Sequence, residues 1–287
     1  MSIEINKLSY TYTFGKERIS ALSDITLSIG DGEFVGIMGP TGCGKSTFLQ
    51  ILAGLLEPET GKVILDGDDI NAPSYNRALL RKKVGMVFQY PEYQLFETTV
   101  EKDVAFGLRH SGLSSSEIKE RVQWALEVMG FSFEKIGHCS PLSLSGGEKR
   151  RVAIAGVLAT KPKYLIFDEP LAGLDAYARQ DFMKLVTSLN KENMTIIMVS
   201  HNTDYLFEYA SRILIFEEGH LLMDRSPEEL FAEETVEEPI LLPICPGGVR
   251  RVAGHLHQEG ILPHGNLVKY QDLLDHLVLH LGGGEDR

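Results

Sequence analysis

The sequence has few cysteines and no long apolar run, and both absences narrow what it can encode. Its three cysteines, Cys43, Cys139 and Cys245, are too far apart to form a Cys-x-x-Cys pair, so we expect all of them to be reduced and none to hold a metal. No stretch of about 18 apolar residues could cross a bilayer, and residues 1–4 do not resemble the start of a signal peptide. These absences predict a chain that is made and kept in the cytoplasm.

Positive charge is scarce as well. The chain has 28 Lys and Arg residues against 40 Asp and Glu residues, a formal net charge of −12. This balance argues against nucleic acid or an anionic membrane surface as the main partner, although Lys149-Arg150-Arg151 forms a local basic cluster. With 43% hydrophobic residues in 287, the chain can bury one large core and carry a modest appendage.

Apolar periodicity predicts an α/β nucleotide-binding fold. Alternation over residues 1–30 indicates antiparallel strands, and the apolar run 34–38 leads into a helix that begins at Lys45. Buried-strand runs at 164–167 and 195–199 enclose a helical stretch near 176–191, which is typical of a parallel sheet covered on both faces. We therefore expect a parallel core sheet, an antiparallel β subdomain and a helical subdomain inserted at about 90–160.

The composition changes after about residue 231. An acidic, proline-containing stretch follows, and then two short helices with apolar residues at helical spacing, which include Val249 and Leu256 in the first and Leu273 and Leu277 in the second. We predict a domain of residues 1–231, and a linker with a small C-terminal helical domain over 232–287.

A glycine-rich segment between the first buried strand and its helix fits the pattern G-x-x-x-x-G-K-[ST]. Backbone N–H groups of such a loop cradle phosphates, the lysine adds positive charge, and the hydroxyl of Ser46 can ligate Mg²⁺. The alternative, a purely structural turn, does not account for the strand before it and the helix after it. The predicted phosphate-binding residues are Gly39, Pro40, Thr41, Gly42, Cys43, Gly44, Lys45, Ser46 and Thr47.

Polar residues follow three of the predicted buried strands. Asp168 and Glu169 end one strand, where Asp168 would hold Mg²⁺ and Glu169 would polarise an attacking water. His201 follows another strand and could reach a γ-phosphate, and Gln89 could contact Mg²⁺ and the water. Each of these residues by itself could be an ordinary strand-end side chain, and only their combination with the phosphate loop favours catalysis.

A second glycine-rich segment, Leu144-Ser145-Gly146-Gly147-Glu148, also has the character of a phosphate site. Its serine hydroxyl and its glycine N–H groups stand at a predicted helix start, where an anion can bind. One chain with one nucleotide does not need two such loops.

Taken in order, these motifs resemble those of ATP-binding cassette proteins over roughly residues 1–230. The resemblance implies that Tyr12 stacks on the adenine, that the segment Ala172 to Asp175 is the D-loop, and that Ser145, Gly146, Gly147 and Glu148 cap the ATP of a second subunit in a head-to-tail dimer. ATP and Mg²⁺ are the cofactors that it implies. Three positions depart from the usual pattern, namely Cys43, Leu171 and Glu148, and the last adds a negative charge close to the expected phosphate.

The segment 88–107 is similar to the Q-loop region of ATPases from energy-coupling factor transporters, which import vitamins and cobalt or nickel ions. This narrower resemblance implies an importer subunit at the cytoplasmic face of the membrane, with a paralogous second ATPase, a membrane coupling subunit and a membrane substrate-binding subunit as partners. Tyr90, Tyr93, Leu95 and Phe96 could dock a helix of the coupling subunit, or could instead pack inside the helical insert. Other cassette transporters, soluble cassette ATPases and a regulator without turnover remain alternatives.

Overall fold

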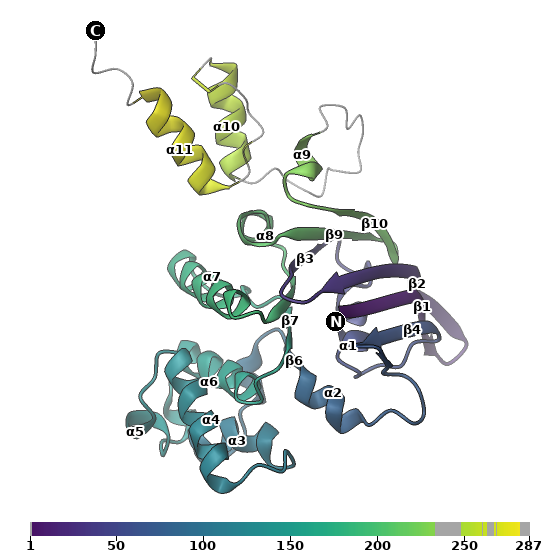
Figure 1. Ribbon diagram of the computed structural model, residues 1–287, viewed down its shortest axis with the longest axis vertical. Coiled ribbons are helices and arrows are strands. Elements are labelled where there is room, and N and C mark those ends of the chain that lie inside the picture. Colours follow the sequence, from purple (N-terminus) through teal and green to yellow (C-terminus); the bar gives the residue numbers. More distant parts are fainter. Residues whose placement is uncertain (1, 233–247, 260, 263–266, 268, 282–287) are drawn as a thin grey trace.

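A six-stranded sheet forms the centre of the molecule, which is described here from a computed structural model covering residues 2–232, 248–259, 261–262, 267 and 269–281 (Figure 1). The strand order is β10-β9-β3-β8-β7-β6. Strands β3, β6, β7, β8 and β9 are parallel, and β10 pairs with β9 in the antiparallel sense. Their bounds are β3 Phe34–Met38, β6 Val84–Val87, β7 Tyr164–Asp168, β8 Thr195–Val199, β9 Arg212–Glu217 and β10 His220–Arg225.

A second sheet is antiparallel, with the order β2-β1-β4-β5. Strands β1 and β2 confirm the alternating pattern that predicts a hairpin at the N-terminus, and Gly32 adopts the positive φ of the turn that follows. The pairs β4–β5 and β9–β10 were not among the predicted elements. The strands of this sheet are β1 Ser2–Phe14, β2 Glu17–Gly30, β4 Thr60–Leu65 and β5 Asp68–Asp69.

Successive residues of the central strands face two different cores, because side chains alternate across a β-strand. Phe34 of β3 and Phe167 of β7 pack into a core shared with helices, whereas Val35 and Ile166 pack into a core shared with the antiparallel sheet. The nearly continuous apolar strands of the sequence reflect this burial on both faces. The helices after β3, between β7 and β8, and after β8 are α1 Lys45–Leu52, α7 Ala176–Lys191 and α8 Thr203–Tyr209.

Short helices gather in one lobe between β6 and β7, the lower part of Figure 1. The longest of them, α4 and α6, both begin with a capping box, in which an N-cap serine and a glutamate three residues later satisfy each other's backbone N–H groups. The helices between β4 and β7, with η marking 3₁₀-helices, are α2 Arg77–Lys83, η1 Pro91–Gln94, α3 Val100–Ala105, η2 Phe106–Leu108, α4 Ser115–Val128, α5 Phe133–Ile136, η3 Pro141–Ser143 and α6 Gly146–Leu158.

An ion-pair cluster joins the antiparallel sheet to the central sheet. Asp66, in the turn between β4 and β5, accepts from Lys163 at 2.6 Å and from the hydroxyl of Tyr164 at 2.8 Å, and it pairs with Lys83 at 2.9 Å. The Asp66 side chain is only 7% exposed. Hydrogen bonds from Lys163, Lys83 and Tyr164 outweigh the effect of burial and lower the pKa of Asp66 to about 2.

Two helices lie near the C-terminus, α10 Gly248–Gln258 and α11 Tyr270–Leu281, and Ala253 of α10, Leu273 of α11 and Leu262 between them form one small apolar cluster. The N–H groups of Gly248 and Tyr270 donate to the carboxylates of Asp204 and Glu208 on α8. A short helix, α9 Glu229–Ala232, precedes them. Cys245 and positions 233–247, which hold most of the predicted linker, lie outside the described residues. Within the described part of the chain, no helix has the length and apolarity needed to span a bilayer.

Candidate active site

The predicted site residues come together because four parallel strands end at the same edge of the sheet. In the order β3-β8-β7-β6, these strands are followed by the phosphate loop, by His201, by Glu169 and by Gln89. Ligands of open α/β sheets bind at the carboxyl ends of such strands. Residues that span more than 160 positions of sequence therefore face one region of space.

The phosphate loop has a backbone that only glycine adopts comfortably. Gly44, the N-cap of α1, has φ 101°, and a Cβ at this position would lie 2.3 Å from the carbonyl oxygen of Ala21. No side chain caps α1, so the N–H groups of its first turn remain available to an anion. The buried ammonium of Lys45 donates to the carbonyl oxygens of Gly39 at 2.8 Å and Pro40 at 2.7 Å. The loop thus holds its positive charge beside a row of free donors.

Ser46 and Asp168 meet across the start of α1 and the end of β7. The serine hydroxyl donates to Oδ1 of Asp168 at 3.1 Å. Burial raises the pKa of Asp168, while the hydrogen bond from Ser46 and the charges of Lys45 and His201 act in the opposite direction. A hydroxyl and a carboxylate at this separation are the hard oxygen donors that Mg²⁺ prefers, so the pair fits that ion.

Glu169 has a strained backbone, with φ 52° in the left-handed region. Its N–H donates to the carbonyl of Val199 at 3.0 Å, which fixes the turn to the end of β8. The N–H of His201 donates to Oε2 of Glu169 at 3.1 Å, and Nε2 of His201 lies 3.4 Å from Oε1. Oε1 is buried and has no hydrogen-bond partner. The carboxylate is therefore held in place, and Oε1, which lies beside the His201 ring without a hydrogen bond, can still accept one.

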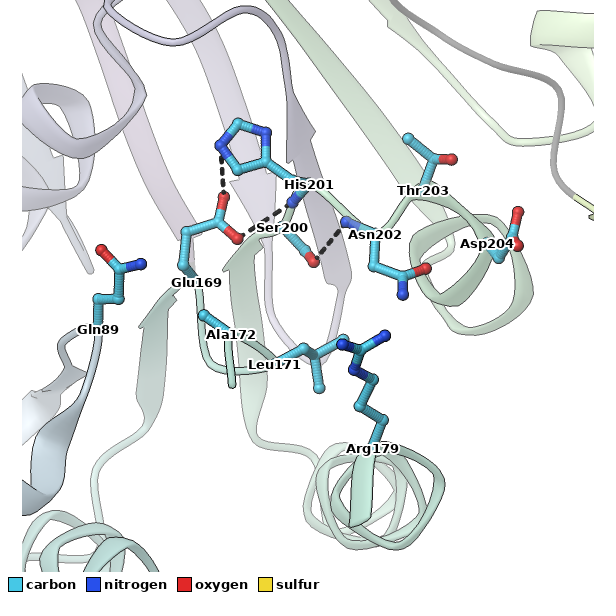
Figure 2. Close-up of a pocket in the computed structure, with 10 residues that line it drawn as sticks. All are labelled: Gln89, Glu169, Leu171, Ala172, Arg179, Ser200, His201, Asn202, Thr203 and Asp204. Carbon is cyan, nitrogen blue, oxygen red and sulfur yellow. Dashed lines mark hydrogen bonds and ion pairs between the residues drawn. The ribbon is translucent and has the colours of Figure 1, made fainter. Parts of the chain in front are cut away.

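A cavity of about 410 Å³ surrounds this carboxylate (Figure 2). Gln89 lines it from the end of β6, on the other side of Glu169 from Asn202 and Asp204. Ser200 and Asn202 also line the cavity, and the N–H of Asn202 donates to the Ser200 hydroxyl at 3.0 Å. These two residues were not among the predicted site residues, since small polar residues after a strand carry no distinctive signal.

Tyr12 lies on β1, and its hydroxyl stands 3.2 Å from Oγ1 of Thr47 in α1. Its ring stacks on that of Phe14 at an interplanar angle of 17°, with centroids 6.0 Å apart. The structure therefore brings Tyr12 to the phosphate loop, although 35 positions of sequence separate it from Thr47.

The second glycine-rich segment does not join this site. Ser145, Gly147 and Glu148 line a different cavity, between α6 and α7. Ser145 is the N-cap of α6: it donates from its N–H and its hydroxyl to Oε2 of Glu148, at 2.8 and 2.7 Å, and accepts from the N–H of Glu148 at 3.4 Å. The hydrogen bonds from Ser145 lower the pKa of Glu148. The glutamate at this position is thus half of a capping box, a structural use that its charge alone did not indicate.

Two further residues lie around the loop after Glu169. Asp175 is the N-cap of α7 and accepts from the N–H of Ala178 at 2.8 Å. Arg150 of α6 is buried, and its guanidinium donates to carbonyl oxygens of that loop. In the sequence, Arg150 was recognised only as a member of the basic cluster Lys149-Arg150-Arg151, and its burial was not predicted.

Comparison with known proteins assigns the family. The model of the family described as ABC transporter matches residues 22–172. The energy-coupling factor transporter ATP-binding protein EcfA2 of Clostridium tetani is 46% identical over 243 residues, which cover 83% of each chain. The protein of the same name from Caldanaerobacter subterraneus subsp. tengcongensis is 42% identical and covers 99% of each chain.

Solved structures agree with this assignment. CbiO1 of Clostridium perfringens, part of the ABC transporter complex cbiONQ, matches with a TM-score of 0.73 and 37% identity, covering 89% of this chain and 98% of that one. A dimer of the cassette MJ0796 bound to ADP and Pi matches with a TM-score of 0.69 and 31% identity, covering 78% of this chain and 98% of that one. The chain thus belongs to the ABC transporter family, as one of its ATP-hydrolysing cassettes. Within that family it is one of the ATP-binding subunits of energy-coupling factor transporters.

Proposed function

We propose that this chain hydrolyses ATP to drive an energy-coupling factor importer of vitamins or of cobalt or nickel ions, bound to a membrane partner at the cytoplasmic face of the cell membrane. The observation that carries the proposal is the convergence of Lys45, the Ser46–Asp168 pair and the Glu169–His201 pair at one edge of the sheet. The name of the Clostridium perfringens neighbour, part of a cbiONQ complex, supports an assembly with other subunits.

In this proposal, the residues from Gly39 to Thr47 bind the phosphates of ATP. Lys45 exchanges its two carbonyl acceptors for phosphate oxygens, and the free N–H groups at the start of α1 add further donors. Tyr12, held beside Thr47, offers the face of its ring to the adenine.

Ser46, Asp168 and Gln89 would hold Mg²⁺, which supplies positive charge to the β- and γ-phosphate oxygens when it is bound. Glu169 accepts the proton of the attacking water through Oε1, which makes no hydrogen bond, because Oε2 already accepts from the N–H of His201. The ring of His201 lies next to that carboxylate and contacts the γ-phosphate.

The segment Ser145 to Glu148 would close over ATP held by a second subunit. A Cβ at Gly146 or at Gly147 would meet no atom of this chain within 4 Å, and neither residue has a positive φ. Nothing within the chain therefore requires glycine at these two positions, and we attribute both to an interaction outside the chain. Close approach of a phosphate from the partner is that interaction. Asp175, at the start of α7, would face the partner as part of the D-loop.

That second subunit is, in our proposal, a paralogue rather than a second copy, because the relatives carry the name of one particular type, EcfA2. A membrane coupling subunit and a membrane substrate-binding subunit complete the assembly. The docking surface consists of Tyr90, Tyr93 and Phe96, with exposed fractions of 40%, 84% and 65%, whereas Leu95 packs against the core of the helical lobe. Phe96 stacks edge-to-face on Phe106, which lines an adjoining cavity of about 660 Å³. Exposed aromatic rings beside a cavity suit an apolar helix of the coupling subunit.

The replacement Glu169→Gln, made in the transporter complex purified from membranes, tests the catalytic assignment. We expect ATP hydrolysis to fall by about a hundredfold or more while ATP remains bound and holds the cassette dimer together. Glu192→Gln, the same change at an exposed residue after α7, is the matched control and should leave turnover unaltered. Turnover of the Glu169 variant at the wild-type rate would remove Glu169 from this role.

A further inference from the structure

Arg150 is the most deeply buried arginine side chain near the proposed active site, with 6% of the residue exposed. It lies on α6, five residues after the N-cap Ser145. Its Nη1 donates to the carbonyl oxygen of Ala172 at 2.8 Å, and its Nη2 donates to the carbonyl oxygen of Pro170. Pro170 directly follows Glu169, so one fork of two hydrogen bonds fastens the loop after the catalytic carboxylate to the helix that carries the second glycine-rich segment.

The turn η1 packs against the same helix from another direction. It carries Glu92, whose Oε2 is buried without a hydrogen-bond partner, and Nε of Arg150 is likewise buried and unpartnered. The charge of Glu92 acts on the Arg150 guanidinium and offsets part of its burial. Just before η1, the ring of Tyr90 lies over the loop: a Cβ at Gly173 would be 3.5 Å from its Cε1 atom. The docking surface and the D-loop therefore meet around one guanidinium.

A buried guanidinium needs a stronger reason than filling space. Its removal from water is unfavourable unless its N–H groups find acceptors, and an apolar side chain would fill the same volume without that cost. Two carbonyl oxygens accept from Nη1 and Nη2, whereas Nε of Arg150 and Oε2 of Glu92 are each buried without a hydrogen bond. Native structures rarely leave such groups unpaired unless the arrangement has a second state or a function.

We propose that Arg150 is a positioning residue for ATP hydrolysis: it sets the loop that carries Glu169 relative to α6, and the packing of η1, which carries Glu92, against α6 makes that setting depend on η1. Arg150 touches neither nucleotide nor water in this proposal. It acts by keeping Glu169 in line with a γ-phosphate while the docking surface is engaged. The inference rests on the proposed function, because it needs both the role of Glu169 and a partner at η1.

The test compares Arg150→Met, Arg150→Lys and Glu92→Gln in the purified transporter complex. For Arg150→Met we expect kcat to fall by about tenfold or more with KM for ATP changed less than about twofold, since a small displacement of a catalytic group lowers the rate without touching the binding loop. Arg150→Lys should restore part of kcat, because one ammonium reaches one carbonyl but cannot form the fork. Glu92→Gln should lower kcat in the wild-type background and have no further effect beside Arg150→Met.

Arg151→Met is the matched control. It removes the same group from the next position of α6, where the guanidinium lies 4.5 Å from the Phe131 ring centroid and 3.5 Å from the carbonyl of Met129. The proposal would be overturned if Arg151→Met lowered kcat as much as Arg150→Met does. It would also be overturned if the loss of kcat in the double variant Glu92→Gln, Arg150→Met equalled the product of the two single losses, because the two residues would then act independently. If Arg150→Met does not fold, Arg150→Lys and Glu92→Gln decide the question. A wild-type complex that neither binds nor hydrolyses ATP would instead refute the proposed function.

Discussion

Replacing Asp66 by asparagine probes the joint between the two sheets. Asp66 accepts from Lys163 and Tyr164 and pairs with Lys83, and these partners lower its pKa from 3.8 to about 2. One pKa unit corresponds to about 1.4 kcal/mol, so a difference of nearly two units is worth roughly 2 kcal/mol of folding free energy at neutral pH. The Asp66 side chain is 7% exposed, but those of Lys83 and Lys163 are 31% and 30% exposed, so solvent screens part of that value and roughly 2 kcal/mol is its upper bound.

The pH dependence follows from the direction of the shift. A carboxyl whose pKa is lower in the folded protein stabilises the fold fully above its unfolded value and loses that effect as the pH falls through the folded value. For Asp66 the loss falls between about pH 4 and pH 2. The stability difference between wild type and Asp66→Asn should therefore be largest at pH 7 and shrink towards zero across that window.

Urea unfolding of both proteins at pH 7, 4 and 3 measures this difference. Asp181→Asn is the control, because Asp181 pairs with Lys184 at 3.4 Å with both side chains more than half exposed. Such a surface pair contributes about 0 to 1 kcal/mol. The reasoning fails if Asp66→Asn destabilises no more than the control at pH 7, or if its effect is the same at pH 3.

Two further perturbations address the partner-facing surfaces. Glu148→Gln keeps the capping acceptor for Ser145 but removes the charge, so we expect it to alter turnover only at the site on the partner's phosphate loop. This effect should persist when Glu169→Gln silences this chain's own site. Equal changes in turnover at both sites would contradict this. Tyr93→Ala combined with Phe96→Ala should abolish co-purification of membrane proteins while ATP binding persists, whereas Leu55→Ala, equally a loss of an exposed apolar side chain, should not.

Local sequence was sufficient to predict much of the core fold. Apolar runs predicted the strands that end at Asp168 and Val199 and the helix α7 between them, because burial on both faces of a parallel sheet imposes a local apolar pattern. Glycine positions predicted the helix that begins at Lys45, because the turn of a phosphate loop requires them. The pairs β4–β5 and β9–β10 were not predicted. Strands β4, β5 and β10 have few buried residues and so no clear apolar pattern, whereas β9 has an apolar run like that of β7 and was overlooked.

The roles of Arg150 and Asp66 could not be read in the same way. Arg150 and Arg151 are adjacent in a basic cluster, yet the 100° rotation between neighbouring helical residues buries one against the D-loop and lays the other on Phe131. Asp66 meets Lys163 from 97 positions away. Contacts of this kind depend on how helices and sheets pack, and no local pattern encodes that packing.

The sequence by itself determined the class of chemistry, because a phosphate loop and strand-end carboxylates require particular residue types at fixed local spacings. The tertiary structure decided which residues share a site. Parallel strands ending at one edge brought Ser46, Asp168, Glu169 and His201 together, and the same packing kept Ser145 to Glu148 apart from them, in a separate cavity. Distances between segments are set by the packing of the whole core, so the separation of the two glycine-rich loops, which the sequence implied only through its family resemblance, is a property of the folded chain.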